Sequence, residues 1–259
     1  MPLAPLDVIF SLPHFALILF RLGGLMLTAP LLASGAVPLR VRVGFAAMLA
    51  LMMLPAVRVY LPESLPIPVL VGTVVSELAI GAAIGMSLTI VLMSADLAGN
   101  LVGQQGGLAM GAIFDPMLNR NTTVTGQLYT VVFTLVYLLV GGHRATLAAL
   151  LDTYKAVPPL TYPFDDSIVL LLVEMLTAAF ILAIRVSGPV LIALFLVGTA
   201  MGFLSRTMPQ FNVLSVGFTI RAMVAIGIAG LSLSACGDLL TEMIWKGMTM
   251  TRISFGLQP

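Results

Sequence analysis

The chain has 259 residues, of which 59% are hydrophobic and only 9% are charged. A soluble domain carries about 25% charged residues because its surface faces water, so this composition excludes an ordinary soluble protein. The 12 basic and 11 acidic residues nearly cancel, and no basic surface for nucleic acid is expected. The single cysteine, Cys236, excludes an internal disulfide and a cysteine metal cluster.

Six apolar segments have roughly the length, about 20 residues, that an α-helix needs to cross a bilayer. In chain order they cover residues 8–33, 43–57, 67–95, 124–140, 168–204 and 213–235. Backbone groups in lipid must be hydrogen-bonded within the segment, which helices achieve, and the alternating pattern of a membrane barrel is missing. We therefore predict an all-α, multi-pass membrane protein of long, kinked helices and helical hairpins.

Basic residues do not mark one side of this six-segment topology. Cytoplasmic loops normally carry a clear excess of lysine and arginine. Here one set of loops holds Arg40, Arg42, Arg120 and Arg206, and the other side holds Arg58, Arg144, Lys155, Lys246 and Arg252. Either the number of spans differs from six, or the protein is not a conventional bundle lying in a bilayer.

Segment 168–204 is too long for one simple span. It contains the run Ser187-Gly188-Pro189 near its middle. Proline removes one helical hydrogen bond and its ring crowds the preceding turn. We therefore expect a kink or a break at this point.

A polar stripe continues the apolar segment that ends near Ala95. Asp96, Asn100 and Gln104 follow at intervals of four residues, a spacing that places them on one face of a helix. The stripe indicates either a water-filled lumen, a polar partner, or a helix that has left the membrane.

Four charged residues lie well inside the apolar segments: Arg21, Glu77, Arg185 and Arg221. An arginine or a carboxylate at the centre of a membrane helix opposes insertion by about 2.5–3.5 kcal/mol. These side chains must therefore face protein or water. They form either a transport pathway or structural ion pairs within an assembly, and we prefer the second interpretation.

The long polar stretch 103–123 contains a glycine-rich run with bulky apolar residues. The residues that matter are Gly106, Gly107, Leu108, Met110, Gly111, Ile113, Phe114, Asp115 and Pro116. Glycine gives the backbone freedom to move, while apolar side chains exclude water. The run suits either a movable seal across an aqueous path or a surface loop without a gating role.

The sequence carries no pattern typical of an enzyme. His14 and His143 are the only histidines, and neither lies in a metal-binding HExxH motif. There is no GxSxG nucleophile motif and no P-loop lysine. We predict a protein that is not an enzyme and that binds no metal and no cofactor.

Several runs resemble the FliR family of flagellar biosynthetic proteins and their injectisome counterparts. They are Phe20-Arg21-Leu22-Gly23-Gly24, Ala36-Val37-Pro38-Leu39-Arg40-Val41-Arg42, Glu77-Leu78-Ala79-Ile80-Gly81, Gln105-Gly106-Gly107-Leu108, Phe114-Asp115-Pro116, Gly142-His143 and Arg206-Thr207-Met208-Pro209-Gln210-Phe211-Asn212. They stand in family order and extend from about residue 20 to 220, so the resemblance covers nearly the whole chain.

The resemblance implies a subunit of the type III protein export gate, located in the bacterial inner membrane at the flagellar basal body. It implies FliP, FliQ and FlhB type partners, with unfolded flagellar proteins as the exported cargo. It also implies a FliP-like portion over residues 1–167, including a plug loop at 103–123, and a FliQ-like helical hairpin with a C-terminal tail over 168–259. In that family, the loop corresponding to 106–116 plugs the central pore, which assigns Leu108, Met110, Ile113 and Phe114 to the plug.

Two further expectations complete the sequence interpretation. Arg206, Pro209, Gln210 and Asn212 are predicted to form a structured turn that contacts a neighbouring subunit. The alternative functions are an injectisome export-gate homologue and a small secondary transporter that uses Glu77 and Arg185. A transporter normally has internal repeats with matched broken helices, and no convincing repeat is present.

Overall fold

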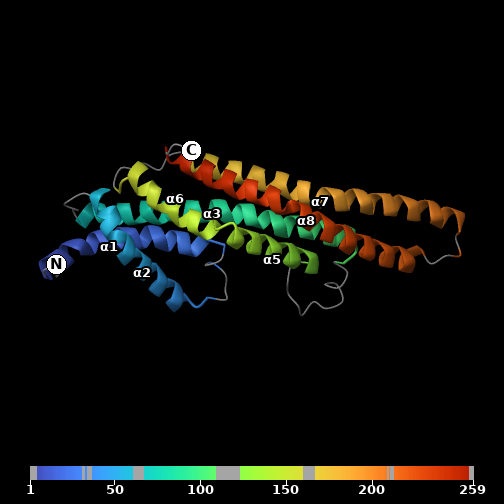
Figure 1. Ribbon diagram of the computed structural model, residues 1–259, viewed down its shortest axis with the longest axis horizontal. Coiled ribbons are helices and arrows are strands. Elements are labelled where there is room, and N and C mark those ends of the chain that lie inside the picture. The colour runs from blue at the N-terminus through green and yellow to red at the C-terminus, as the bar shows by residue number, and fades with distance from the viewer. Residues whose placement is uncertain are drawn as a thin grey trace. The chain divides into compact units, whose positions relative to one another are not determined.

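The computed structural model describes residues 5–30, 33, 37–60, 67–108, 123–159, 167–208, 210 and 213–256. Within these ranges every regular element is a helix, as predicted (Figure 1). The elements are α1 (Pro5–Thr28), α2 (Leu39–Val57), the 3-10 helix η1 (Arg58–Tyr60), α3 (Ile67–Gln105), α5 (Val124–Leu139), α6 (Gly142–Ala156), α7 (Ser167–Thr207) and α8 (Val213–Ser254).

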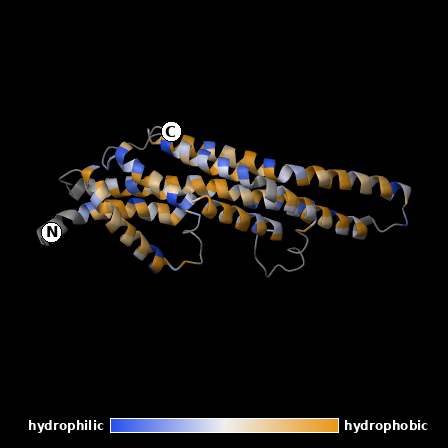
Figure 2. Ribbon diagram, in the orientation of Figure 1, coloured by the Kyte–Doolittle hydropathy of each residue, from blue (hydrophilic) through white to orange (hydrophobic). Residues whose placement is uncertain are grey.

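The described helices offer four membrane spans, or five, instead of the six expected. The four are Leu39–Val57, Gly72–Gln105, Ile168–Thr207 and Ser215–Leu233. A fifth arises if α5 and α6, which meet at an angle of 62°, count as one bent span. In α1 the apolar part described is shorter, Pro13–Thr28. Hydrophobic residues run along the whole length of α7 (Figure 2).

The bend between α5 and α6 has a local cause. Gly141 has a φ of 77°, a left-handed conformation that glycine adopts without steric cost and other residues avoid. The carbonyl oxygen of Gly141 then accepts backbone hydrogen bonds from Arg144 and Ala145 and so begins α6. The predicted segment 124–140 is therefore followed by a second helix after one residue in the left-handed conformation, Gly141.

Of the kink or break expected at Pro189, the break does not occur, because α7 is continuous from Ser167 to Thr207; the kink stays a prediction. Two serine side chains bond to backbone carbonyls in the turns that precede the proline. Ser187 donates to the carbonyl of Ala183 at 2.8 Å, and Ser232 of α8 donates to the carbonyl of Val186 at 2.8 Å.

Helix α3 confirms the expectation that the third apolar segment continues as a helix beyond Ala95. It extends to Gln105 and is 39 residues long. Asp96, Asn100 and Gln104 therefore do stand on successive turns of one helix.

The chain separates into two compact units. The first contains Met1–Ile90, Gly141–Leu176 and Ile244–Pro259, and the second contains Val91–Val140 and Thr177–Met243. The long helices α3, α7 and α8 contribute to both. These limits are set by contacts and differ from the division at residue 167 implied by the family resemblance, which stays a prediction.

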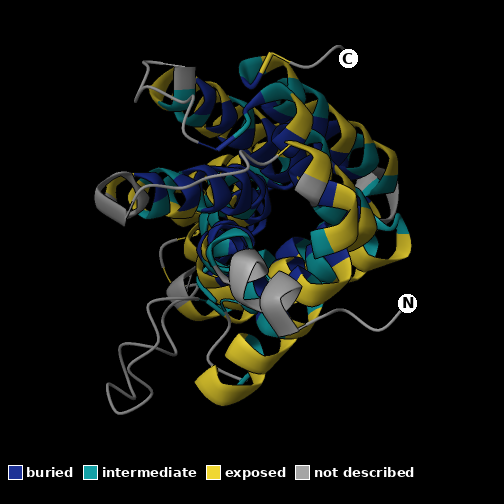
Figure 3. Cartoon of the chain, turned by 90° about the vertical axis from the view of Figure 1, so that its left-hand side faces the viewer, coloured by how far each residue is buried: buried dark blue, intermediate teal, exposed yellow. Residues whose placement is uncertain are grey.

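The first unit has an apolar core built from sequence-distant segments. Leu22 and Leu25 of α1 pack with Ala50 of α2, Ile84 of α3 and Leu150 of α6. The C-terminal part of α8 closes this core, because Phe255 is 4% exposed within it. Figure 3 shows buried residues facing inward among the helices and exposed residues on their outer sides. The core of the first unit therefore includes a residue that follows α8.

Polar contacts fasten the end of α8 to the same unit. Thr251 and Ser87 of α3 lie 3.2 Å apart through their hydroxyl oxygens. Arg252 forms an ion pair of 3.5 Å with Asp152 of α6. These contacts join the end of α8 to α3 and α6 within the first unit.

Helices α1 and α3 approach each other closely at glycines. A Cβ atom on Gly24 would overlap the carbonyl oxygen of Leu78, and one on Gly81 would overlap the carbonyl oxygen of Arg21. Thr28 uses the short distance to donate to the carbonyl of Ala82 at 3.0 Å. Small residues at such crossings let two helix backbones come together.

We expect Gly24→Ala to destabilise the protein by about 1–3 kcal/mol, because the added methyl group must push α3 away. Gly23→Ala is the matched control, since a Cβ there meets no atom within 4 Å. That change should be neutral or stabilising by up to about 1 kcal/mol through helix propensity. Thermal unfolding of the purified variants measures both. Equal midpoints for the two variants would contradict the close crossing.

Candidate functional site

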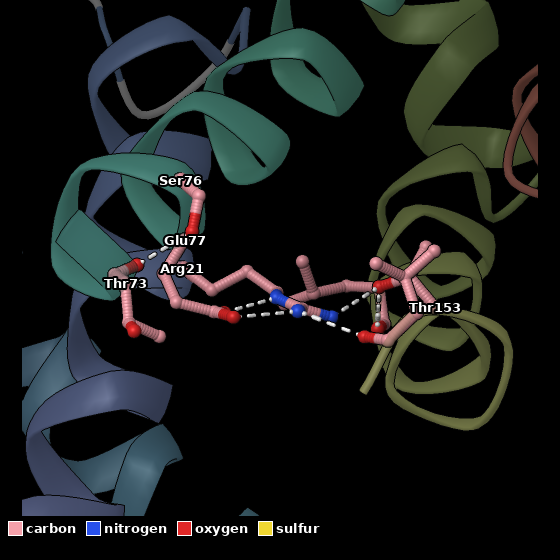
Figure 4. A network of polar contacts seen from close by, with 7 residues as sticks. Arg21, Thr73, Ser76, Glu77 and Thr153 are labelled. Atoms are coloured by element: carbon pink, nitrogen blue, oxygen red, sulfur yellow. Dashed lines mark hydrogen bonds and ion pairs between the residues drawn. The ribbon is translucent and has the colours of Figure 1, made fainter. Parts of the chain in front are cut away.

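Arg21 and Glu77 form a buried ion pair in the first unit. The side chains are 0% and 1% exposed, and Figure 4 shows the guanidinium of Arg21 pointing directly at the carboxylate. Arg21 Nε donates to Glu77 Oε2 at 2.5 Å, and Nη2 donates to Oε1 at 2.9 Å. Two parallel bonds of this kind give an arginine–carboxylate pair both strength and fixed geometry.

The other side of the guanidinium holds the end of α6. Nη1 donates to the hydroxyl of Thr153 at 3.1 Å, and Nη2 donates to the carbonyl of Val157 at 3.1 Å. The ring centroid of Tyr154 lies 4.0 Å from the guanidinium carbon, a cation–π distance. A cation is also favourable at a helix C-terminus, where backbone carbonyls have no helical partner. One arginine thus ties α1 to α3 and α6.

The four intramembrane charges therefore fall into two groups. Arg21 and Glu77 pair with each other inside the chain. Arg185 is exposed on α7, and Arg221 of α8 is half-buried. The guanidinium of Arg221 lies beside Gly198, where a Cβ would stand 2.9 Å from Nη2. Among the described residues, no ion pair includes Arg185 or Arg221.

In the second unit, two members of the polar stripe fix the start of α5. Asn100 Nδ2 donates to Asp96 Oδ2 at 3.1 Å. Asn100 Oδ1 accepts from the backbone N–H and from the hydroxyl of Thr123, each at 2.9 Å. Thr123 is the N-cap of α5, and its hydroxyl accepts from the N–H of Gly126 at 3.0 Å. Gln104, the third member, is exposed.

Close backbone packing supports this connection. Thr125 donates to the carbonyl of Gly99 at 2.8 Å, and a Cβ on Gly99 would overlap the backbone of Gly126. We call Gly99, Asn100, Thr123, Thr125 and Gly126 the stem clamp. The sequence interpretation did not assign Thr123 or Thr125, although a threonine just before an apolar helix is a common N-cap signal.

The stem clamp joins the helices on either side of the predicted plug. Met110, Gly111, Ile113, Phe114, Asp115 and Pro116 lie outside the described residues. Gly106 and Gly107 are described and pack toward α8, where a Cβ would meet Ala225 at 2.8 Å and Phe218 at 2.9 Å, respectively. Gly107 also has a φ of 76°. Side chains larger than hydrogen are therefore excluded at both positions.

Thr123→Val should destabilise the protein by about 1–2 kcal/mol, the usual cost of losing an N-cap. The change keeps the branched shape and removes the hydroxyl that bonds Asn100 and Gly126. Thr130→Val is the matched control, because the Thr130 hydroxyl donates only to the carbonyl of Gly126 in its own helix. Thr123→Ser should retain most of the stability. Equal unfolding temperatures for Thr123→Val and Thr123→Ser would contradict a stabilising role of the Thr123 hydroxyl in the stem clamp.

Two remaining predictions concern the turn at 206–212 and metal binding. Arg206 and Gln210 are exposed, whereas Pro209 and Asn212 lie outside the described residues. No three His, Cys, Asp or Glu side chains come together as metal ligands in the part of the chain that the structure describes.

Comparison with known proteins decides the family. The model of the family described as bacterial export proteins, family 1, matches residues 12–247, which is most of the chain. The chain belongs to this family. Its relatives include flagellar biosynthetic proteins named FliR, which confirms the predicted relationship to FliR.

It is 29% identical to the flagellar biosynthetic protein FliR of Pectobacterium carotovorum subsp. carotovorum, with 82% of this chain and 81% of the relative covered. FliR of Escherichia coli (strain K12) is 27% identical, with 81% and 80% covered. The secretion system apparatus protein SsaT of Salmonella typhimurium is 27% identical, with 60% of each chain covered. The FliR-family chain is a multi-pass membrane protein and a component of a type III export apparatus.

Proposed function

We propose that this chain is a non-enzymatic subunit of the flagellar type III protein export gate in the bacterial inner membrane. It assembles there with FliP, FliQ and FlhB type subunits and passes unfolded flagellar proteins. The observation that carries the proposal is the family match over residues 12–247, together with flagellar relatives aligned over about four-fifths of their length.

The described surface supports a role inside an assembly. Large apolar side chains are exposed along α2 and α7, for example Met52, Phe195 and Phe203. Arg185 lies on the same α7 helix without an ion-pair partner in the described part of the chain. Apolar surface suits lipid or protein neighbours, whereas an arginine is costly in lipid. Protein neighbours can cover the apolar surface and also supply a polar partner for the arginine.

The proposal includes a closed pore. The loop between α3 and α5, with Leu108, Met110, Ile113 and Phe114, is the pore plug that the family resemblance implies. The stem clamp supports it, because Asn100 and Thr123 hold the two ends of the loop together. Gln104, exposed at the end of α3, faces the aqueous path. Asn100 belongs to the stem clamp, and Asp96 accepts a hydrogen bond from its side chain.

Purification of the tagged chain from its native membrane tests the proposal. Mass spectrometry should identify FliP-, FliQ- and FlhB-type subunits in a stable complex, and loss of the gene should abolish flagellar assembly. A homo-oligomer that binds a small solute would overturn the proposal and favour a secondary transporter. Loss of injectisome secretion with intact motility would instead favour the homologous injectisome gate.

A cysteine at Gln210 should crosslink to a partner chain in the assembled complex. Gln210 is exposed in the isolated chain, and its amide can bond to backbone groups that helix ends leave unpaired. The variant is made in a Cys236→Ser background, so that one thiol is present. Labelling by a bulky water-soluble reagent that is equally fast in the complex and in the isolated chain would contradict an inter-subunit turn.

A further inference from the structure

Arg185 occupies an unusual position in the second unit. It stands near the middle of α7, a 41-residue helix, and its side chain is exposed. The residues that share its face are exposed and apolar. They are Ile181, Ile192, Leu196 and Phe203. A single cation is thus surrounded by hydrophobic surface.

In the described part of the chain, no acidic side chain neutralises this cation. No ion pair among the described residues includes Arg185. Glu174 is the acidic residue of α7 within the described range, and it lies eleven positions away, about 16 Å along a helix. A guanidinium cannot bridge that distance. A carboxylate of another molecule could neutralise it.

A glycine lies beside the arginine on the surface of α7. Gly188 lies one turn after Arg185, and a Cβ there would meet no atom within 4 Å. Small residues on a helix surface let the backbone of a second helix approach. Gly188 therefore allows a second helix to approach α7 closely at this point.

We propose that the Arg185 face of α7 binds an apolar helix of another subunit that carries one aspartate or glutamate opposite Arg185. An anionic lipid would place its phosphate at the membrane surface, whereas this arginine lies between two long apolar stretches. The guanidinium takes a carboxylate through two parallel hydrogen bonds. The inference rests on the proposed export-gate function and specifies the chemistry of one partner contact.

The test uses the full chain in its assembled complex. Arg185→Leu should lower the amount of co-purified partner about tenfold, as expected when one partner of a desolvated charge pair is removed. Arg185→Lys keeps the charge and should retain most of the complex. Arg144→Leu is the matched control, since Arg144 is exposed at the start of α6. Alkaline extraction of membranes should find all variants inserted like wild type.

A photo-crosslinking residue at position 192 should capture an apolar helix with a central carboxylate. Exchanging the charges, with Arg185→Glu here and the carboxylate changed to arginine in the captured chain, should restore the complex. Wild-type recovery of partner with Arg185→Leu would overturn the inference, as would capture of lipid or a second copy of this chain. In those cases the export-gate proposal stands. A wild-type chain without any partner subunit would overturn both.

Discussion

Arg21→Leu should destabilise the protein by about 3–5 kcal/mol, the usual effect of stranding one member of a buried ion pair. Glu77 is 1% exposed and would lose the partner of both its carboxylate oxygens. The variant also loses the bonds to Thr153 and Val157 that hold the end of α6. Because these partners belong to the same chain, we expect the subunit itself to unfold more easily, before any effect on assembly.

Thermal or denaturant unfolding of the purified chain in detergent measures this effect. The double variant Arg21→Leu/Glu77→Leu should regain much of the lost stability, because no buried charge remains unpaired. Arg185→Leu, which removes an exposed arginine, should leave the unfolding midpoint of the isolated chain nearly unchanged. A double variant as unstable as Arg21→Leu alone would argue that packing, and not charge pairing, dominates at this site.

Deleting residues 107–113 should leave the export complex assembled and make the membrane leak ions and small solutes. A pore wide enough for an unfolded chain needs an apolar constriction that excludes water when it is idle, and glycine lets that constriction move. The deletion leaves residues 114–122 to rejoin the helices. Nine residues can span about 30 Å, which suffices for ends that Asn100 and Thr123 hold together.

Conductance, or sensitivity of cells to a small toxic solute, measures the leak in cells that express the whole gate. Changing Met110 and Phe114 together to glycine should cause a smaller leak, because Leu108 and Ile113 remain. Blue-native gels check that the complex still forms. A deletion that assembles and leaks no more than wild type would rule out the plug while leaving membership of the complex intact.

The sequence by itself determined the features that depend on local chemistry. The low fraction of charged residues and the long apolar segments indicated an all-α membrane protein. In lipid, the backbone hydrogen bonds of each segment must form within that segment. The i,i+4 spacing of Asp96, Asn100 and Gln104 correctly predicted that α3 continues beyond Ala95. The motif runs, taken in chain order, predicted the family, and the family match over residues 12–247 confirms it. None of these conclusions required knowing which helices meet.

Tertiary structure decided which residues act together. Arg21 and Glu77 are 56 positions apart, and only the glycine crossing of α1 and α3 brings them into contact. Arg185 looked equivalent to them in sequence, yet it lies exposed on α7. Phe255 joins the core of the first unit. Hydrophobicity and helix propensity act within a segment, whereas charge pairing and core packing depend on contacts between distant segments that no local pattern specifies.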